Sequence, residues 1–200
     1  MTGILKVDQI QNNTGTSALT INSSGQISPQ QTTGNSVYGT YSSGNSWTPG
    51  ANVVPSWAMD VTMVFTEVSH VAALSGGQEP GIQAYVGGST APAGSYNYVW
   101  WYASNGGTVT LSDFRTAGHT RLHAGGFTNP NNIFSGKITF SRTSTSSFIY
   151  AFECQPGNKG YAYNHGWTGT VNLSGPISGL GWATNSSAGF NSGTARVFWS

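Results

Sequence analysis

The chain has 200 residues, enough for one large all-β domain or for a smaller domain with an appendage. Only 6% of the residues are charged, the formal net charge is +1 and the 7 Lys and Arg residues are scattered, so no nucleic-acid partner is expected. A cytosolic enzyme typically has about 25% charged residues, whereas this polar but uncharged composition suits an extracellular or virion surface.

The first ten residues lack the pattern of a signal peptide, because Lys6 and Asp8 interrupt the apolar residues. No run in the chain approaches the ~20 apolar residues of a membrane span, so no membrane insertion is expected. Cys154 is the only cysteine, so no disulfide can form within the chain. A secreted cellular protein of this composition would be expected to carry disulfides. We therefore expect a protein that folds in a reducing cytoplasm and is then released or assembled.

Residues 1–36 form a segment with little apolar mass, and no aromatic residue occurs before Tyr38. Short alternating stretches are separated by polar turns at Gly15 and Gly25. Such a segment cannot bury a core by itself. It is either a flexible tail or a series of short strands that pair with other chains, as in a fibre where three copies wrap round one axis. The apolar residues expected to make these anchoring contacts are Leu5, Val7, Ile10, Leu19 and Ile21.

Residues 37–200 contain all the aromatic residues and are expected to form the folded domain. The longest predicted strand is Trp57–Val68, in which five apolar residues occupy every second position and so share one face. This pattern is typical of a central strand with one buried face. The five residues are Trp57, Met59, Val61, Met63 and Phe65.

The stretch Ser135–Phe152 predicts a β-hairpin with a Ser/Thr-rich turn. Ile138 and Phe140 alternate with polar residues in its first arm, and Phe148, Tyr150 and Phe152 alternate in its second arm. This period of two places the aromatic residues on one face. Because a lone hairpin is marginally stable in water, a second layer must cover that face.

About ten short strands are expected in residues 37–200, with turn residues between them. No helical pattern longer than one turn occurs, and no window is rich in Ala, Leu, Glu and Lys. Many short strands separated by turns indicate a sandwich or a barrel. The predicted fold is therefore an all-β, jelly-roll-like β-sandwich, preceded by an extended N-terminal segment.

Aromatic residues in loops and on exposed strand faces are candidates for a glycan site, because sugar rings stack on Trp and Tyr while polar side chains reach their hydroxyls. The candidate contact residues are Trp101, Trp167, Tyr163, His165 and Arg121. By contrast, Trp100 and Trp182 are expected to belong to the core or to a subunit interface. The predicted partner at this site is a glycan of a host cell surface.

Catalysis is not expected. The chain has six carboxylates, and no two of them are placed by spacing as the acid and base of a glycosidase. His119 and His123 lack the intervening Glu and the helix of a zinc protease, and no Gly-x-Ser-x-Gly elbow occurs. The prediction is a non-enzymatic protein with no metal and no cofactor.

Several segments resemble recurrent patterns of bacteriophage virion proteins. The C-terminal pattern is carried by SGKITFSRTSTSSFIYAFEC at Ser135–Cys154 and ISGLGWATNSSAGFNSGTARVFW at Ile177–Trp199, and WAMDVTMVFTEV at Trp57–Val68 resembles the strand that leads this domain. The opening ILKVDQIQNNTGTSALTINSSGQI is similar to N-terminal segments of phage tail-fibre and other virion appendage proteins. The resemblance covers both ends and about half of the chain.

This resemblance implies a jelly-roll-like sandwich on a trimeric stalk, joined to other virion proteins through residues 1–36. The first interpretation is a tail fibre or receptor-binding appendage that contacts the host surface. The second is a capsid decoration or head-fibre protein, whose N-terminal segment wedges into the capsid lattice. A third, a glycan-degrading depolymerase, is disfavoured because no carboxylate pair is evident.

Overall fold

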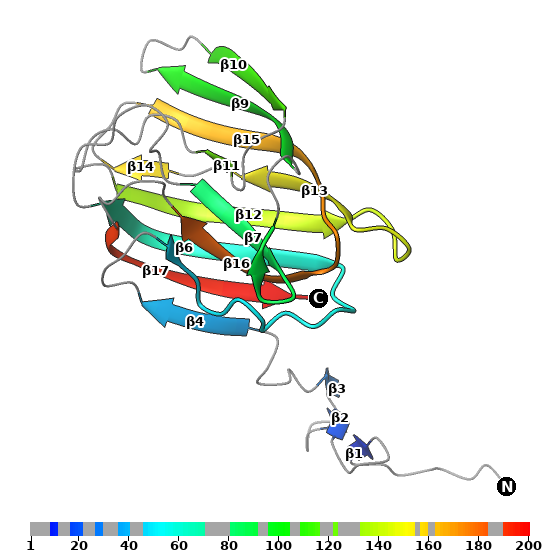
Figure 1. Cartoon of the computed structure of the whole chain (residues 1–200). Coiled ribbons are helices and arrows are strands. Elements are labelled where there is room, and N and C mark those ends of the chain that lie inside the picture. Colours follow the sequence, from blue (N-terminus) through cyan, green and yellow to red (C-terminus); the bar gives the residue numbers. More distant parts are fainter. Residues whose placement is uncertain are drawn as a thin grey trace, which may run out of the picture. The chain divides into compact units, whose positions relative to one another are not determined.

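A computed structural model shows that the chain divides into two compact units, Met1–Asn35 and Ser36–Ser200 (Figure 1). The composition had placed this division between residues 36 and 37. The residues that the structure describes are 9–11, 17–21, 27–29, 36–40, 46–70, 81–91, 96–104, 109–116, 122–123, 133–154, 157–159, 163–183 and 190–200. Within them no helix occurs, and so none that is long and apolar enough to cross a membrane.

The N-terminal unit contains a three-stranded antiparallel sheet in the order β1-β2-β3. Its strands are β1 (Gln9–Gln11), β2 (Ser17–Ile21) and β3 (Ile27–Pro29). Ile10 is paired with Leu19 and Ile21 with Ile27, so these strands pair within one chain. Of the predicted anchoring residues, Leu5 and Val7 lie outside the described residues, while Ile10, Leu19 and Ile21 lie on β1 and β2. Their contact with other chains stays a prediction.

The second unit is a β-sandwich of two antiparallel sheets, which confirms the predicted all-β fold. The large sheet has nine strands in the order β10-β9-β15-β13-β12-β6-β17-β4, with β14 paired to β12. Its strands are β4 (Ser36–Thr40), β6 (Asp60–His70), β9 (Tyr96–Ser104), β10 (Val109–Thr116), β12 (Ile133–Arg142), β13 (Ile149–Cys154), β14 (Gly157–Lys159), β15 (Tyr163–Asn172) and β17 (Phe190–Trp199). The small sheet has five strands in the order β11-β7-β16-β5, with β8 paired to β7. Its strands are β5 (Ser46–Trp47), β7 (Gly81–Val86), β8 (Ser89–Thr90), β11 (Leu122–His123) and β16 (Ile177–Ala183).

The predicted hairpin is confirmed as β12 and β13, which lie in the middle of the large sheet between β6 and β15. Phe140 pairs with Phe152, and both side chains are buried together with Tyr150. Phe148 is the exception, because it lies in the turn and packs only partly against the core. The alternation predicted the buried face of this hairpin correctly, because strand side chains have a period of two.

The small sheet is the second layer that covers this face. Leu180 and Trp182 of β16 are fully buried in the same core as the large-sheet side chains. The Trp182 ring lies 5.0 Å from the Phe65 ring and 6.1 Å from the Phe190 ring, measured between centroids, so rings of both sheets interlock. Burying one such side chain stabilises the fold by about 1.5–3 kcal/mol. The expectation that Trp182 belongs to the core is confirmed.

Two buried tyrosines link the sheets through their hydroxyl groups. The backbone N–H of Ala84 on β7 donates to the hydroxyl of Tyr96 on β9, at 2.9 Å. The backbone N–H of Ile177 on β16 donates to the hydroxyl of Tyr150 on β13, at 3.0 Å. A buried N–H without a partner is costly, so each tyrosine satisfies a donor of the opposite sheet.

The strand predicted for Trp57–Val68 begins three residues later than expected, at Asp60, and Trp57 lies before it with 61% of its surface exposed. The alternation also changes phase near its end, since Phe65 and Val68 are both buried. Between them lies a β-bulge in which Glu67 has a φ of 54°, a conformation that L residues rarely adopt. Ser135 accepts a hydrogen bond from the Glu67 N–H and Ser192 donates one to its carbonyl oxygen, so both neighbouring strands hold the bulge.

The sandwich has more strands than the ten predicted from the sequence. The strands not expected from the sequence include β5, β8, β11 and β14, which have only two or three residues each. Such strands are too short to show an alternating pattern and are defined by their neighbours in the sheet.

We predict that Tyr96→Phe lowers the free energy of unfolding by about 1–3 kcal/mol, because it leaves the buried Ala84 N–H without an acceptor. Chemical denaturation measures this change. Tyr85→Phe is the control, because Tyr85 is also buried and its hydroxyl makes no hydrogen bond among the described residues. This variant should cost less than about 0.5 kcal/mol. Equal losses in the two variants would contradict the proposed link.

We also predict that the protein loses stability as the pH rises above 10. Burial raises the pKa of Tyr96, Tyr150 and Tyr85 above the ordinary value of 10.0. The unfolded state therefore releases these protons at a lower pH than the folded state, so the stabilisation is complete below pH 10 and declines above it. Denaturation at several pH values and the absorbance of tyrosinate measure the effect. An unfolding free energy that is constant between about pH 9 and pH 12 would contradict it.

Candidate functional site

The outer face of the small sheet is covered by the chain itself. All residues of β16 are buried, including Ser178 and the glycines that alternate with Leu180 and Trp182. The N–H groups of Val53 and Val54 both donate to the Ser178 carbonyl oxygen, at 2.9 and 3.0 Å. The Ser178 hydroxyl donates to the carbonyl oxygen of Ala51, at 2.7 Å. This covering segment leaves no room for a partner over β16.

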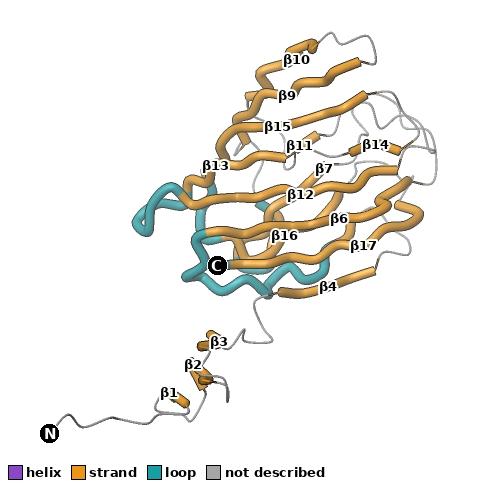
Figure 2. Tube along the Cα trace, turned by 180° about the vertical axis from the view of Figure 1, so that it is seen from behind, coloured by secondary structure: helices purple, strands orange, loops and turns teal. Residues whose placement is uncertain are grey.

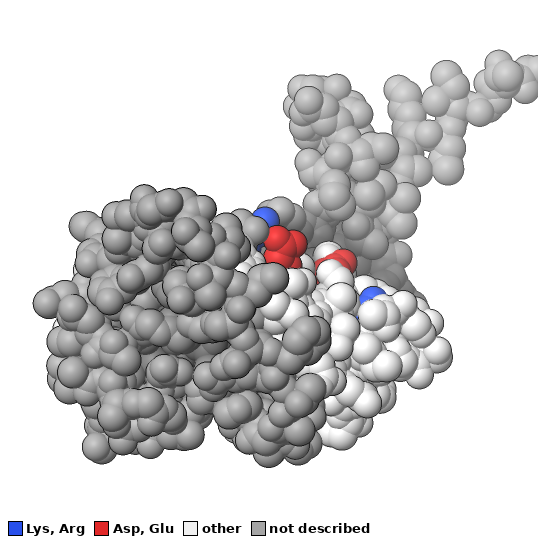
Figure 3. Space-filling model, turned by 90° about the horizontal axis from the view of Figure 1, so that it is seen from above, with Lys and Arg blue, Asp and Glu red and all other residues white. Residues whose placement is uncertain are grey.

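The outer face of the large sheet is open. The residues that alternate with the buried ones on its central strands are exposed or half-buried, and they form rows across paired strands. One row across β9, β15, β13, β12, β6 and β17 consists of Val99, Thr168, Glu153, Thr139, Thr62 and Phe198. Thr62 and Thr139 share a hydrogen bond of 3.0 Å between their hydroxyls. Small hydroxyl side chains therefore make up much of this face, and charged side chains occupy little of the described surface in the view of Figure 3.

A neighbouring row on this face carries two cations. Lys137 on β12 and Arg196 on β17 are both paired with Val64 on β6, which is 38% exposed. Strands are spaced about 4.8 Å apart, so the two backbone positions lie about 10 Å apart. The Arg196 guanidinium lies 4.8 Å above the Phe198 ring and donates two hydrogen bonds to the Ser36 hydroxyl. It is thus held flat on the sheet.

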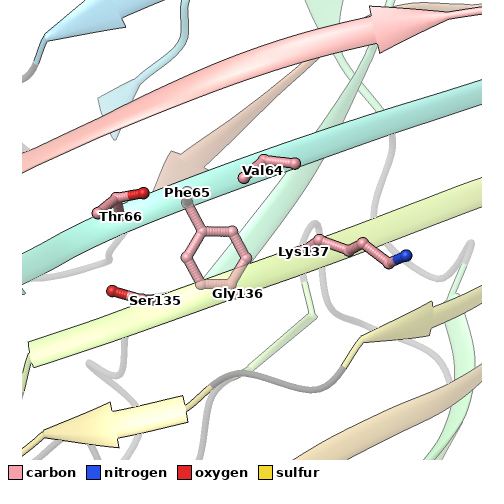
Figure 4. A pocket seen from close by; sticks show the side chains of 6 residues that line it. All are labelled: Val64, Phe65, Thr66, Ser135, Gly136 and Lys137. Atoms are coloured by element: carbon pink, nitrogen blue, oxygen red, sulfur yellow. The ribbon is translucent and has the colours of Figure 1, made fainter.

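A shallow depression of about 460 Å³ lies beside this row (Figure 4). Figure 4 shows Val64 and Thr66 of β6 and Ser135 and Lys137 of β12 around Gly136, which contributes no side chain. The open face therefore offers hydroxyls, one ammonium group and a small hollow.

The structure does not bring the predicted glycan residues together on one surface. Trp167 is 1% exposed and packs in the core, so the expectation that it contacts a ligand is corrected. On β9 its partner is Trp100, whereas Trp101 is paired with Gly166, so Trp101 and Trp167 lie on opposite faces of the sheet. On β9 both faces carry apolar residues, so the sequence could not place Trp101. On β15, by contrast, Trp167 shares its face with Val171 and the other face carries Thr168 and Thr170, which was an available signal for burial. Trp101 is half-buried on the open face and stays a candidate.

The other predicted contact residues are Tyr163, His165 and Arg121. Tyr163 and His165 are positions of β15, but the description does not extend to their side chains, and Arg121 lies outside the described residues. His119 and the side chain of His123 also lie outside the described part of the chain. Within the described residues, no group of three His, Cys, Asp or Glu side chains could hold a metal ion. Cys154 is buried, and burial raises the pKa of its thiol well above the ordinary value, so it contributes to packing.

One exposed aromatic residue was missed by the sequence reasoning. Trp57 borders a cleft of about 510 Å³ at one end of the sandwich. The other residues that line the cleft are Ser56, Met59, Arg142, Thr145, Phe148 and Pro176. Pro55, two residues before Trp57, was the available signal, because proline disfavours a central strand at this point. Figure 2 shows the loops that supply these residues at the same end as the C-terminus.

Comparisons with known proteins give no family for this chain. A scan against protein-family models and a search of curated proteins both found no match. The structure is similar to that of the marine PL-14 alginate lyase from Aplysia kurodai, with a TM-score of 0.37 and 9% sequence identity, over 91% of this chain and 85% of that chain.

We predict that Gly169→Ala destabilises the sandwich more than Gly166→Ala. A Cβ at position 169 would overlap the backbone of Asn97 and Tyr98 on β9, which cannot move without disturbing the pairing. A Cβ at position 166 would overlap only the Trp101 indole, which can rotate away into solvent. Chemical denaturation should show a loss of about 1–3 kcal/mol for Gly169→Ala and a smaller one for Gly166→Ala. The reverse order would show that the indole is fixed and is part of the sheet packing.

Proposed function

We propose that the chain is a non-enzymatic structural protein of a bacteriophage virion, a trimeric tail fibre or receptor-binding appendage. Its N-terminal unit attaches the protein to other virion proteins, and its sandwich contacts a glycan on the host surface. The protein is made in the host cytoplasm and then assembled into the virion. The observation that carries this proposal is the combination of a short unit with little apolar mass and an uncharged all-β domain with one open sheet face.

The N-terminal unit supports the attachment role. Its described strands have three to five residues, and the unit contains no aromatic residue. A sheet of this size cannot bury enough surface to offset the entropy of ordering its chain. Contact with other chains would supply the missing burial, and three copies of the unit would supply it to one another.

The open face supports binding rather than catalysis. Hydroxyl groups, Lys137, Arg196 and the half-buried Trp101 suit a sugar surface, in which hydroxyls alternate with apolar ring faces. Asp60, Glu67 and Glu153 are the carboxylates whose side chains the structure describes, and they belong to three different rows of the large sheet, so these three form no facing pair. Each contact would be weak. Three copies on one stalk would multiply the affinity through their effective concentration.

A capsid decoration protein would use the same N-terminal unit in another place, with the sandwich capping the capsid lattice. We predict that antibodies raised against the full chain, with gold labels, mark the tails of the virions that carry it. Electron microscopy measures this. Labels confined to heads would contradict the tail assignment and support the decoration role. Virions without labels would contradict both.

We further predict that the full chain is a trimer at micromolar concentration, because the N-terminal unit is stabilised by other copies. Light scattering with size-exclusion chromatography measures the mass. Removal of residues 1–35 should lower the apparent mass or weaken the association, and the full chain measured at the same concentration is the control. A full chain of monomer mass, 21.0 kDa, would contradict the trimer.

A further inference from the structure

We infer that the cleft at the end of the sandwich, lined by Trp57 and Arg142, binds a sugar ring that carries a carboxylate group. The inference rests on the proposed function, because it names the ligand class and the site through which the appendage would contact an acidic glycan. The cleft is separate from the open sheet face, and none of the residues predicted from the sequence to contact a glycan lines it.

Three segments that are distant in the sequence form this cleft. Ser56, Trp57 and Met59 lie in the segment that leads into β6, Arg142, Thr145 and Phe148 belong to the end of β12 and the following turn, and Pro176 precedes β16. Its volume of about 510 Å³ lies within the usual range of about 300–1,000 Å³ for sites of small ligands. A cleft of this size suits one or two sugar units.

Backbone hydrogen bonds join these segments and hold the cleft in shape. The Arg142 N–H donates to the Met59 carbonyl oxygen, at 2.7 Å, and the Met59 N–H donates to the Ser200 carbonyl oxygen, at 2.8 Å. The Leu173 N–H donates to the Phe148 carbonyl oxygen, at 3.0 Å. A preformed site loses less entropy when a ligand binds. The cleft walls therefore need no refolding to accept a sugar.

Trp57 supplies the stacking surface. It is 61% exposed and is the most exposed large hydrophobic side chain among the described residues. An indole in this position gains little from burial, so its contribution to the stability of the chain itself is small. The C–H groups on one face of a pyranose ring pack against such an indole, and Met59 and Pro176 extend the apolar surface.

Arg142 supplies the charge that selects the ligand. Its Nε donates to the Ser147 carbonyl oxygen at 2.6 Å, its Nη2 donates to the Thr145 carbonyl oxygen at 2.9 Å, and its Cζ lies 4.6 Å from the Phe148 ring centroid. A guanidinium has five N–H donors. Within the described residues Nη1 has no partner, so it and the second N–H of Nη2 stay available as a pair.

That pair of N–H groups matches a carboxylate, which accepts two parallel hydrogen bonds from arginine. No acidic side chain lines the cleft, and within the described residues no ion pair joins Asp60, which follows Met59, to Arg142. A neutral apolar partner, such as a proline-rich peptide or a second copy of the chain, would use Trp57 but leave this charge unpaired. A sugar acid would use both the Trp57 indole and the Arg142 guanidinium, and its ring hydroxyls could bind the hydroxyls of Ser56 and Thr145.

The test uses the full chain and an array of galacturonate and glucuronate oligosaccharides, with the carboxyl-reduced form of each as its neutral counterpart. We expect binding to uronates and at least tenfold weaker binding to the reduced forms. Trp57→Ala and Arg142→Gln should each weaken uronate binding at least tenfold, and Trp57→Phe should restore part of it. The melting temperature of each variant shows whether it is folded. If Arg142→Gln does not fold, Arg142→Lys replaces it, because lysine keeps the positive charge but lacks the paired N–H donors of the guanidinium.

Arg196→Gln and Trp101→Ala are the comparison variants, because they alter the competing site on the open face of the large sheet. Arg196 is also stacked on a phenylalanine, and Trp101 is the described tryptophan of the open face. If the open-face variants weaken uronate binding and the cleft variants do not, the inference is overturned while glycan binding by the chain stands. Binding of no uronate, or equal binding of the reduced forms, also overturns the inference, whereas the virion assignment is tested separately by the gold labelling of virions. Self-association or binding of a proline-rich peptide that Trp57→Ala abolishes would assign the cleft to that occupant instead.

Discussion

The two hydrogen bonds from small-sheet backbone N–H groups to Tyr96 and Tyr150 constrain the whole sandwich. Each hydroxyl reaches from the large sheet across the core to a donor on β7 or β16. Apolar packing alone is tolerant of sliding, whereas a buried N–H is satisfied in one alignment only. These bonds, together with the ring contact between Phe65 and Trp182, therefore set how the two sheets lie over each other. The hairpin at the centre of the large sheet contributes Tyr150 and thus organises both layers.

This alignment determines which surfaces a partner can reach. The inner faces of both sheets are committed to the core, and the segment containing Ala51 and Val53 covers β16 from outside. The described surfaces that a partner can reach include the outer face of the large sheet and the sandwich end with Trp57. Both carry an exposed or half-buried tryptophan, and on both an arginine is stacked on a phenylalanine. We propose that these arginines select an acidic ligand, because the chain carries few charges.

The sequence predicted the fold well where strands are long and one face is apolar. Phe140, Tyr150 and Phe152 alternate strictly, and all are buried as predicted. It failed where long-range pairing decides the structure. Strand β9 carries apolar residues on both faces, so nothing local shows that Trp101 points outward. For Trp167 a local signal existed, because it alternates with Thr168 and shares its face with Val171 on β15. The bulge at Glu67 is likewise held by serines more than sixty residues away, and the cleft at Trp57 exists only because three distant segments meet there.

We propose above all that the protein binds a surface glycan and leaves it intact. The most direct test incubates a uronate polysaccharide with a saturating amount of the full-length protein, recovers the polysaccharide and measures its chain length. Size-exclusion chromatography and an assay of reducing ends determine that length. We predict retention of the polysaccharide by the protein and an unchanged chain length. Shortened chains with new reducing ends would contradict the proposal and would identify the protein as a depolymerase.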